Sequence, residues 1–265
     1  MTSWQRFLIG ILTIFLGVGG WVVTPSSAAG NHPLEGRVFV VDTGRSGEGP
    51  SGRDVYCFRE GKFLSTFHNT QHDFPPGPYT GHRVGDVIHF AADAQSPTRG
   101  SIHWEGTIRG EIINAAFFWR DTPRWYSWHN GPAKYWARSA GWGPTTSSGP
   151  DIAASHLLDG QVYFVKTGEK GNPPDHSDYL IFWEGRFVSS ACVELNFSPS
   201  AYSAIEKDGT IRFHAEIRSP NRGRMTWRGT VRRNNTEGTA EWHYKRLFWE
   251  VVRHYWFRGP VYSME

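Results

Sequence analysis

The sequence predicts an all-β protein that consists of two tandem barrels, each with eight antiparallel strands, after an N-terminal signal helix. Two observations lead to this fold class. The chain of 265 residues has 30 Gly and 16 Pro beside 13 Trp, 10 Tyr and 17 Phe, a composition typical of short strands that tight turns join around an aromatic core. The chain also contains one unit twice. Barrel closure removes exposed strand edges, and a pair of β-sandwiches is the alternative.

The first 29 residues predict an export signal. Arg6 precedes an uncharged apolar run at residues 7–23, and small residues at Ser26/Ala28 or Ser27/Ala29 suit a cleavage site. An uncleaved membrane anchor is the alternative, because 17 residues approach the length of a membrane span. Either way we expect an extracytoplasmic location, periplasmic or secreted.

A shift of about 124 residues superimposes the second half of the chain on the first. Six of eleven positions are identical between residues 34–44 and 158–168, and Trp104 and Trp119 fall on Trp227 and Trp242 once one residue is deleted. We therefore expect a first β domain at 34–138, a Gly/Ser/Pro-rich linker at 139–156 and a second β domain at 157–260.

Each strand is predicted from a short apolar or alternating run between turn residues. Glu60-Gly61 and Glu184-Gly185 separate two such runs, as tight hairpins require. The best helix candidate outside the signal is residues 244–253, but their β-branched and aromatic residues suit a strand equally. The first repeat is expected to place strands near residues 36–42, 53–59, 62–68, 78–84, 86–93, 101–109, 114–120 and 133–138, with the same eight in the second repeat.

In scale and architecture each repeat resembles the calycin-type barrels, the lipocalins and their relatives. The first strand reads Gly36-Arg37-Val38 where a lipocalin has a Gly-x-Trp motif. The resemblance therefore implies a fold and no particular activity.

Composition and motifs give few signs of catalysis. Cys57 aligns with Ile181 and is expected to be a buried apolar residue, whereas Cys192 is placed at the end of the third strand, as a structural residue or, alternatively, a nucleophile. His68 and His72 are read as part of a solvated loop and not as metal ligands. We expect no metal and no cofactor.

Two charged positions are kept in both repeats. Asp54 aligns with Asp178, and Arg138 aligns with Arg258. They are expected to form a structural ion pair near the closure of each barrel.

Binding residues are predicted in two places. Ala191 replaces Phe67 in the second repeat, which suggests a cavity in that barrel, and aromatic stretches beside Arg, Asn and His suit a sugar, an aromatic ligand or a protein partner. The predicted ligand-binding residues are Phe187, Ser189, Cys192 and Tyr202 for the cavity, and Trp125, Trp128 and Trp249 for the aromatic stretches.

Three functions follow in order of preference. The first is an exported, non-catalytic binding protein for a small apolar or aromatic ligand or a glycan. The second is a cell-envelope module whose aromatic loops bind protein or polysaccharide, and the third is an enzyme with Cys192 as its nucleophile. A formal net charge of +3 is too balanced for nucleic acid, and contact with a membrane is expected only through an uncleaved N-terminal segment.

Overall fold

The computed structural model describes residues 32–121, 133–140 and 155–264, so the predicted signal lies outside the described residues. His32–Glu265 forms one compact unit. No helix in the described ranges is long and apolar enough to span a membrane.

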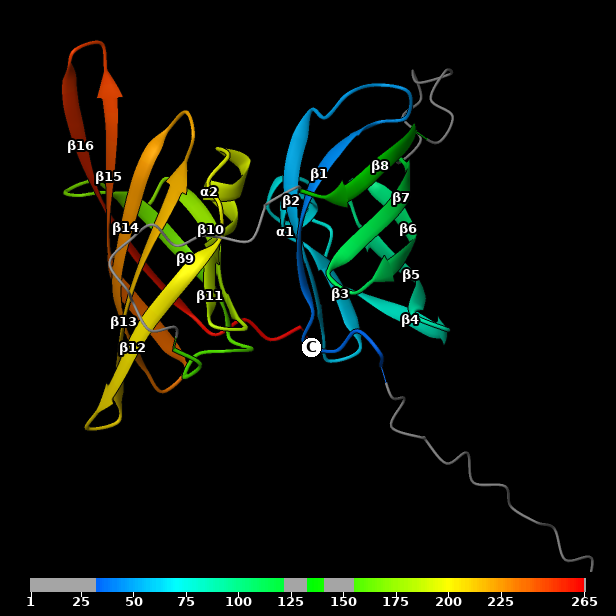
Figure 1. Ribbon diagram of the computed structural model, residues 1–265, viewed down its shortest axis with the longest axis horizontal. Helices are drawn as coiled ribbons and strands as arrows, with labels where there is room; N and C mark the ends of the chain where they lie inside the picture. Colours follow the sequence, from blue (N-terminus) through cyan, green and yellow to red (C-terminus); the bar gives the residue numbers. More distant parts are fainter. Residues whose placement is uncertain (1–31, 122–132, 141–154, 265) are drawn as a thin grey trace, which may run out of the picture. The chain divides into compact units, whose positions relative to one another are not determined.

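The described chain folds into two closed antiparallel barrels of eight strands, which confirms the predicted fold class (Figure 1). Each strand pairs with the next, and the last strand of each barrel pairs back with its first. The first barrel comprises β1 (Val38–Arg45), β2 (Gly52–Arg59), β3 (Lys62–Ser65), β4 (Gly77–Val84), β5 (Val87–Ser96), β6 (Gly100–Arg109), β7 (Ile112–Arg120) and β8 (Ala133–Ser139). The second comprises β9 (Val162–Glu169), β10 (His176–Trp183), β11 (Arg186–Ser189), β12 (Ser200–Lys207), β13 (Thr210–Ser219), β14 (Gly223–Arg232), β15 (Asn235–Arg246) and β16 (Trp249–Pro260).

The hairpin turns form where the sequence predicts them. Glu60 and Gly61 have φ values of 55° and 70°, and Glu184 and Gly185 have 47° and 71°. Two consecutive positive φ values are the mark of a type I′ turn, whose twist matches that of the strands it joins. These turns fix the register of β2 against β3 and of β10 against β11.

Each barrel also contains one short helix directly after its third strand, where the sequence predicts only strand and loop. The helices are α1 (Thr66–His72) and α2 (Ser190–Glu194). Ser65 and Ser189 end the strands in an extended conformation, and their side chains accept the backbone N–H of His68 and Cys192, as helix N-caps do. The prediction that the third strand runs to residue 68, and that Cys192 ends its counterpart, is therefore wrong.

Aromatic rings fill the interior of both barrels. In the second barrel the Phe182 ring lies 4.9 Å from Tyr202 and 5.1 Å from both Phe187 and Phe213, measured between ring centroids. Phe58 and Phe63 take the corresponding places in the first barrel, 5.1 Å apart. Because side chains alternate between the two faces of each strand, every second residue points into the core, and many of these residues are aromatic.

A third hydrophobic cluster draws side chains from both barrels. Six of its members occupy equivalent positions of the two repeats: Val55 and Tyr179, Cys57 and Ile181, Leu64 and Val188. Helix α2 contacts β2, and α1 reciprocally contacts β10. The two repeats thus meet as the subunits of a two-fold symmetric dimer do, through the same surface of each. Cys57 is buried in this cluster, as its alignment with an Ile predicts.

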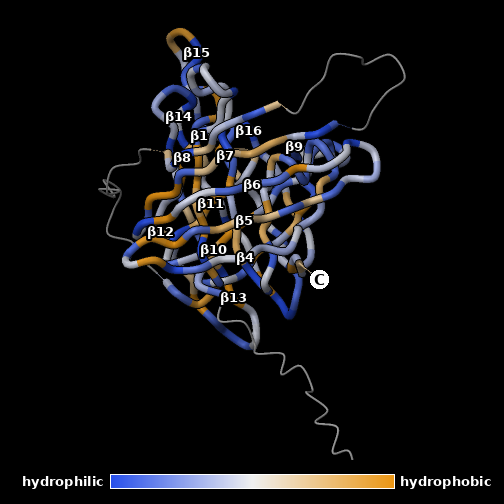
Figure 2. Tube along the Cα trace, turned by 90° about the vertical axis from the view of Figure 1, so that its right-hand side faces the viewer, coloured by the Kyte–Doolittle hydropathy of each residue, from blue (hydrophilic) through white to orange (hydrophobic). Residues whose placement is uncertain are grey.

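The helix candidate at residues 244–253 is a hairpin. Arg246 pairs with Trp249, so β15 and β16 are joined by a two-residue turn, Leu247 and Phe248. The tip is visible as a hydrophobic end above the label of β15 in Figure 2. β-Branched and aromatic residues on both sides of the turn favour the extended conformation.

Candidate functional site

The four residues predicted to line a cavity in the second barrel are buried in its packed interior. Phe187, Ser189 and Tyr202 are fully buried, and Cys192 is 4% exposed. The Tyr202 hydroxyl donates to the Asp159 carboxylate at 3.0 Å and accepts the Leu158 N–H at 2.9 Å. The structure thus gives these side chains packing and hydrogen-bonding partners within the barrel.

Ser189 belongs to a buried polar cluster at the start of α2. Its hydroxyl donates to Asp178 Oδ2 at 2.5 Å and accepts the Cys192 N–H at 3.1 Å. Asp178 Oδ1 accepts the Ser190 hydroxyl and the Ala191 N–H, each at 2.9 Å. Burial raises the pKa of Asp178 above its ordinary value, and these hydrogen bonds oppose the rise.

The first barrel repeats this cluster around Asp54. This carboxylate accepts the hydroxyls of Ser65 and Thr66 and the N–H groups of Val55 and Phe67. An aspartate that links the second strand to a helix N-terminus is therefore a structural element of both repeats.

The predicted ion pairs of Asp54 with Arg138 and of Asp178 with Arg258 are wrong. Both aspartates face the helix starts instead. The Arg138 guanidinium lies 5.3 Å above the Trp136 ring, and Arg258 Nε lies 3.8 Å from Glu237 Oε2.

Cys192 lacks the features of a nucleophile. Its sulfur is buried and lies 3.4 Å from the Met225 sulfur. Burial raises the pKa of the thiol, and the negative charge of Asp178 raises it further. A catalytic thiol needs access and a lowered pKa, so the geometry supports a packing role.

His68 and His72 lie on α1 and not in a loop, with ring centroids 6.0 Å apart. His68 Nδ1 is 2.6 Å from Ser65 Oγ, which also bonds to Asp54, but these three residues are only 2–4% exposed. A reacting serine has to meet its substrate, and this one is enclosed. No group of three or more His, Cys, Asp or Glu in the described ranges is arranged to hold a metal ion.

The structure describes one of the three tryptophans predicted for binding. Trp125 and Trp128 lie outside the described residues. Trp249 is the first residue of β16, and 60% of its surface is exposed at the end of the hairpin.

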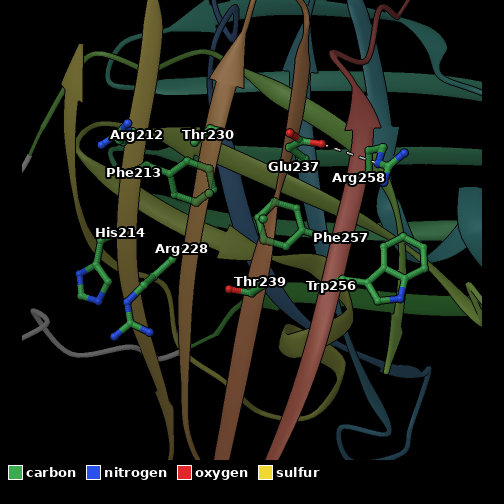
Figure 3. A pocket seen from close by; sticks show the side chains of 12 residues that line it. Arg212, Phe213, His214, Arg228, Thr230, Glu237, Thr239, Trp256, Phe257 and Arg258 are labelled. Atoms are coloured by element: carbon green, nitrogen blue, oxygen red, sulfur yellow. Dashed lines mark ion pairs between the residues drawn. The ribbon is translucent and has the colours of Figure 1, made fainter. Parts of the chain in front are cut away.

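A concave surface lies on the outside of the second barrel, across β13–β16. This groove has a volume of about 660 Å³. Strand register arranges its side chains in two cross-strand rows, with Phe213 and Phe257 between them (Figure 3). One row contains His214, Arg228, Thr239 and Trp256, and the other contains Arg212, Thr230, Glu237 and Arg258.

Gly229 and Gly238 form the floor of the groove between the two rows. They are paired across β14 and β15, and a Cβ atom on either residue would overlap the ring of Phe257 inside the barrel. The missing side chains therefore make room for the packed rings on the inner face, and on the outer face this inward-facing row leaves only backbone between the two rows of side chains.

The groove is cationic. Arg212 makes no ion pair with any described residue, Arg228 is 3.3 Å from Glu241, and Arg258 is 3.8 Å from Glu237. Residues 210–260 contain eleven Lys and Arg against four Asp and Glu, a net charge of +7, although the whole chain has only +3. The rest of the chain therefore has a net charge of −4.

The first barrel has a matching groove with different charges. Its volume is about 460 Å³, and its lining includes His89 and Glu105 at the positions of Arg212 and Arg228. The hollow is thus a property of the repeated fold, whereas the positive charge belongs to the second barrel.

Comparisons with known proteins leave the family open. No protein-family model and no curated protein matches the chain. Among solved structures, a chain described as a "putative outer membrane protein" from Bacteroides fragilis is 7% identical, with 84% of this chain and 96% of that chain covered, at a TM-score of 0.27. A likeness this weak supports no conclusion about function.

Proposed function

We propose that the protein is an exported, non-catalytic binding protein of the cell envelope, and that its second barrel binds an acidic polysaccharide in the β13–β16 groove. The observation that carries this proposal is the pair of cationic rows on either side of the Gly229–Gly238 floor.

The side chains of the groove suit a chain of acidic sugars. Guanidinium groups bind carboxylate and sulfate oxygens through two parallel hydrogen bonds, and Arg212, Arg228 and Arg258 stand at its two sides. Thr230 and Thr239 offer hydroxyl groups to sugar hydroxyls. Trp256 adds a flat face for stacking, and the ring is held because its Nε1 donates to the Asn172 carbonyl at 3.0 Å.

The packed interiors favour this proposal over an internal ligand. Phe187 and Tyr202 contact Phe182 directly, so a molecule in the barrel would have to displace these rings. Binding to polysaccharide through the surface, the second function expected from the sequence, needs no such rearrangement. The binding surface that we infer is a sheet face and not an aromatic loop.

Substitution of Arg212 and Arg228 tests the groove. We expect Arg212→Ala/Arg228→Ala to weaken binding of dextran sulfate about 100-fold, because each charge-assisted contact contributes about 1.4 kcal/mol or more, a factor of ten. Isothermal titration calorimetry measures this, with uncharged dextran as the matched ligand that should not bind.

The control removes the same charge outside the groove. Arg222→Ala/Arg232→Ala should weaken binding less than fivefold, by general electrostatics alone. Equal losses in both double variants would show that the positive charge of the barrel acts diffusely, and the groove would then not be the site.

Affinity should also depend on pH through His214. Burial and the neighbouring Arg228 lower the pKa of His214 below 6.5, while Glu216 opposes this. A bound sulfate favours the charged imidazole, so binding takes up a proton and should tighten as the pH falls from 7 to 5. Titrations of wild type and His214→Gln at several pH values check this. If wild type and His214→Gln show the same pH dependence of binding, His214 is not part of the binding site.

A further inference from the structure

We propose that the tip of the β15–β16 hairpin docks the protein on an anionic lipid bilayer. This activity goes beyond polysaccharide binding and uses other residues than the groove. It rests on how far the hairpin projects, on the apolar residues at its end and on the charges around them.

The end of the hairpin projects beyond the barrel wall. Pairing of β15 with β14 stops at His243, and pairing of β16 with β9 involves only residues 255–258. Residues 244–251 therefore pair only with each other, and Figure 1 shows the end of the hairpin extending past the neighbouring strands. A two-stranded ribbon of this kind gains little stability in water by itself.

The turn at the end exposes three large apolar side chains in a row. Leu247, Phe248 and Trp249 have 79%, 95% and 60% of their surface exposed. Leu247 also has a φ of 57°, a conformation that favours Gly and costs a branched residue roughly 1 kcal/mol or more. An exposed Leu in this position stabilises neither the turn nor the barrel, and the described residues supply no partner that covers it.

Basic side chains surround this apolar end. Lys245, Arg246 and Arg253 are exposed on the two strands next to it. Glu250 is the acidic residue of the ribbon, and it lies 3.0 Å from His243. Each Lys or Arg near an anionic membrane surface contributes about 1 kcal/mol, and long basic side chains reach phosphates while the tip enters the interface.

A hollow at the base of the ribbon is where a lipid phosphate binds in this proposal. It has a volume of about 390 Å³ and is lined in part by Arg218, Arg224 and Lys245. Glu216 pairs with both arginines, at 2.5 Å and 3.6 Å, and Glu250 also lines the hollow.

The dimensions of the tip favour a bilayer over a protein. A stable protein interface needs about 800 Å² from each partner, far more than three side chains at the end of a ribbon offer. A bilayer interface accepts a small apolar insertion that a Trp and basic residues border.

Sedimentation with vesicles tests the proposal. We use residues 30–265, which include the compact unit His32–Glu265, with vesicles of phosphatidylcholine alone or with 30% phosphatidylglycerol. The wild type should bind the anionic vesicles at least tenfold more tightly. Leu247→Gly/Phe248→Asn removes the apolar end but places Gly at the positive φ, so the hairpin should persist while binding falls at least tenfold.

Matched variants separate the possible causes. Ile205→Asn removes another exposed apolar side chain, 72% exposed on β12, and should bind vesicles as the wild type does. Arg246→Gln/Arg253→Gln should lose the preference for phosphatidylglycerol. The groove variant Arg212→Ala/Arg228→Ala should keep vesicle binding, and the tip variant should keep dextran sulfate binding, so the two proposals fail independently.

Two results would overturn membrane docking. One is a tip variant that sediments with anionic vesicles as the wild type does. The other is a wild type that binds neither kind of vesicle. If that wild type instead forms dimers in the analytical ultracentrifuge, and the tip variant does not, the tip is a protein contact.

Discussion

Asp178→Ala is expected to lower the free energy of unfolding by about 4 kcal/mol. The substitution leaves the Ser189 and Ser190 hydroxyls and the Ala191 N–H without their acceptor, next to a packed core. Each buried group that loses its hydrogen bond costs about 1–3 kcal/mol, and the start of α2 loses its connection to β10. Urea denaturation followed by Trp fluorescence measures the change.

Asp178→Asn is the matched control. The amide keeps one oxygen for the Ala191 N–H and can donate its NH₂ to Ser189 Oγ, so the loss should be less than half that of the alanine variant. Asp54→Ala should behave like Asp178→Ala, because its carboxylate has the same partners in the first barrel. A loss below 1 kcal/mol in both alanine variants would show that neither cluster supports its helix.

The same cluster shows where sequence reasoning stops. Asp54/Asp178 and Ser65/Ser189 are visible in the sequence as residues kept in both repeats. Their contact is not visible, since aspartate and serine are eleven positions apart and meet only through the pairing of two strands and the start of a helix. The choice of an arginine as the partner followed from charge alone, whereas buried carboxylates are satisfied by hydroxyl and N–H donors equally well.

The short helices bear on the cavity that the sequence predicts in the second barrel. Ala191 in place of Phe67 leaves space inside a barrel only if both side chains point inward from a strand. They lie on α2 and α1 and are only half-buried. Helices of five and seven residues are too short to show a hydrophobic period, so only the capping serine could have indicated them.

The barrels themselves were predictable because local and global signals agree. Turn residues, alternating strands and the internal repeat all indicate the same eight-stranded unit. The groove was not predictable, since its arginines are spread over β13, β14 and β16 and become neighbours only through strand register. The local charge of residues 210–260 was the available signal, and the total charge of the chain hides it.

The second large effect should appear at the groove floor. A Cβ atom at Gly238 would lie 2.2 Å from the Arg228 carbonyl oxygen and 2.5 Å from the Phe257 ring. We expect Gly238→Ala to lower the free energy of unfolding by about 3 kcal/mol through overpacking, and Phe257→Ala to lower it by about 4 kcal/mol through the cavity left behind.

The two substitutions should compensate each other in part, because the first barrel already contains the combination. Ala115 and Ala137 stand there at the positions of Gly238 and Phe257, paired across β7 and β8. The double variant should therefore lose at least 1 kcal/mol less than the sum of the single losses. Gly238→Ala with Ile88→Ala, a core substitution in the other barrel, should be additive in the same urea titrations. Strict additivity of Gly238→Ala and Phe257→Ala would mean that the backbone contact alone excludes a side chain. The glycine floor would then be required by strand geometry and not by the ring beneath it.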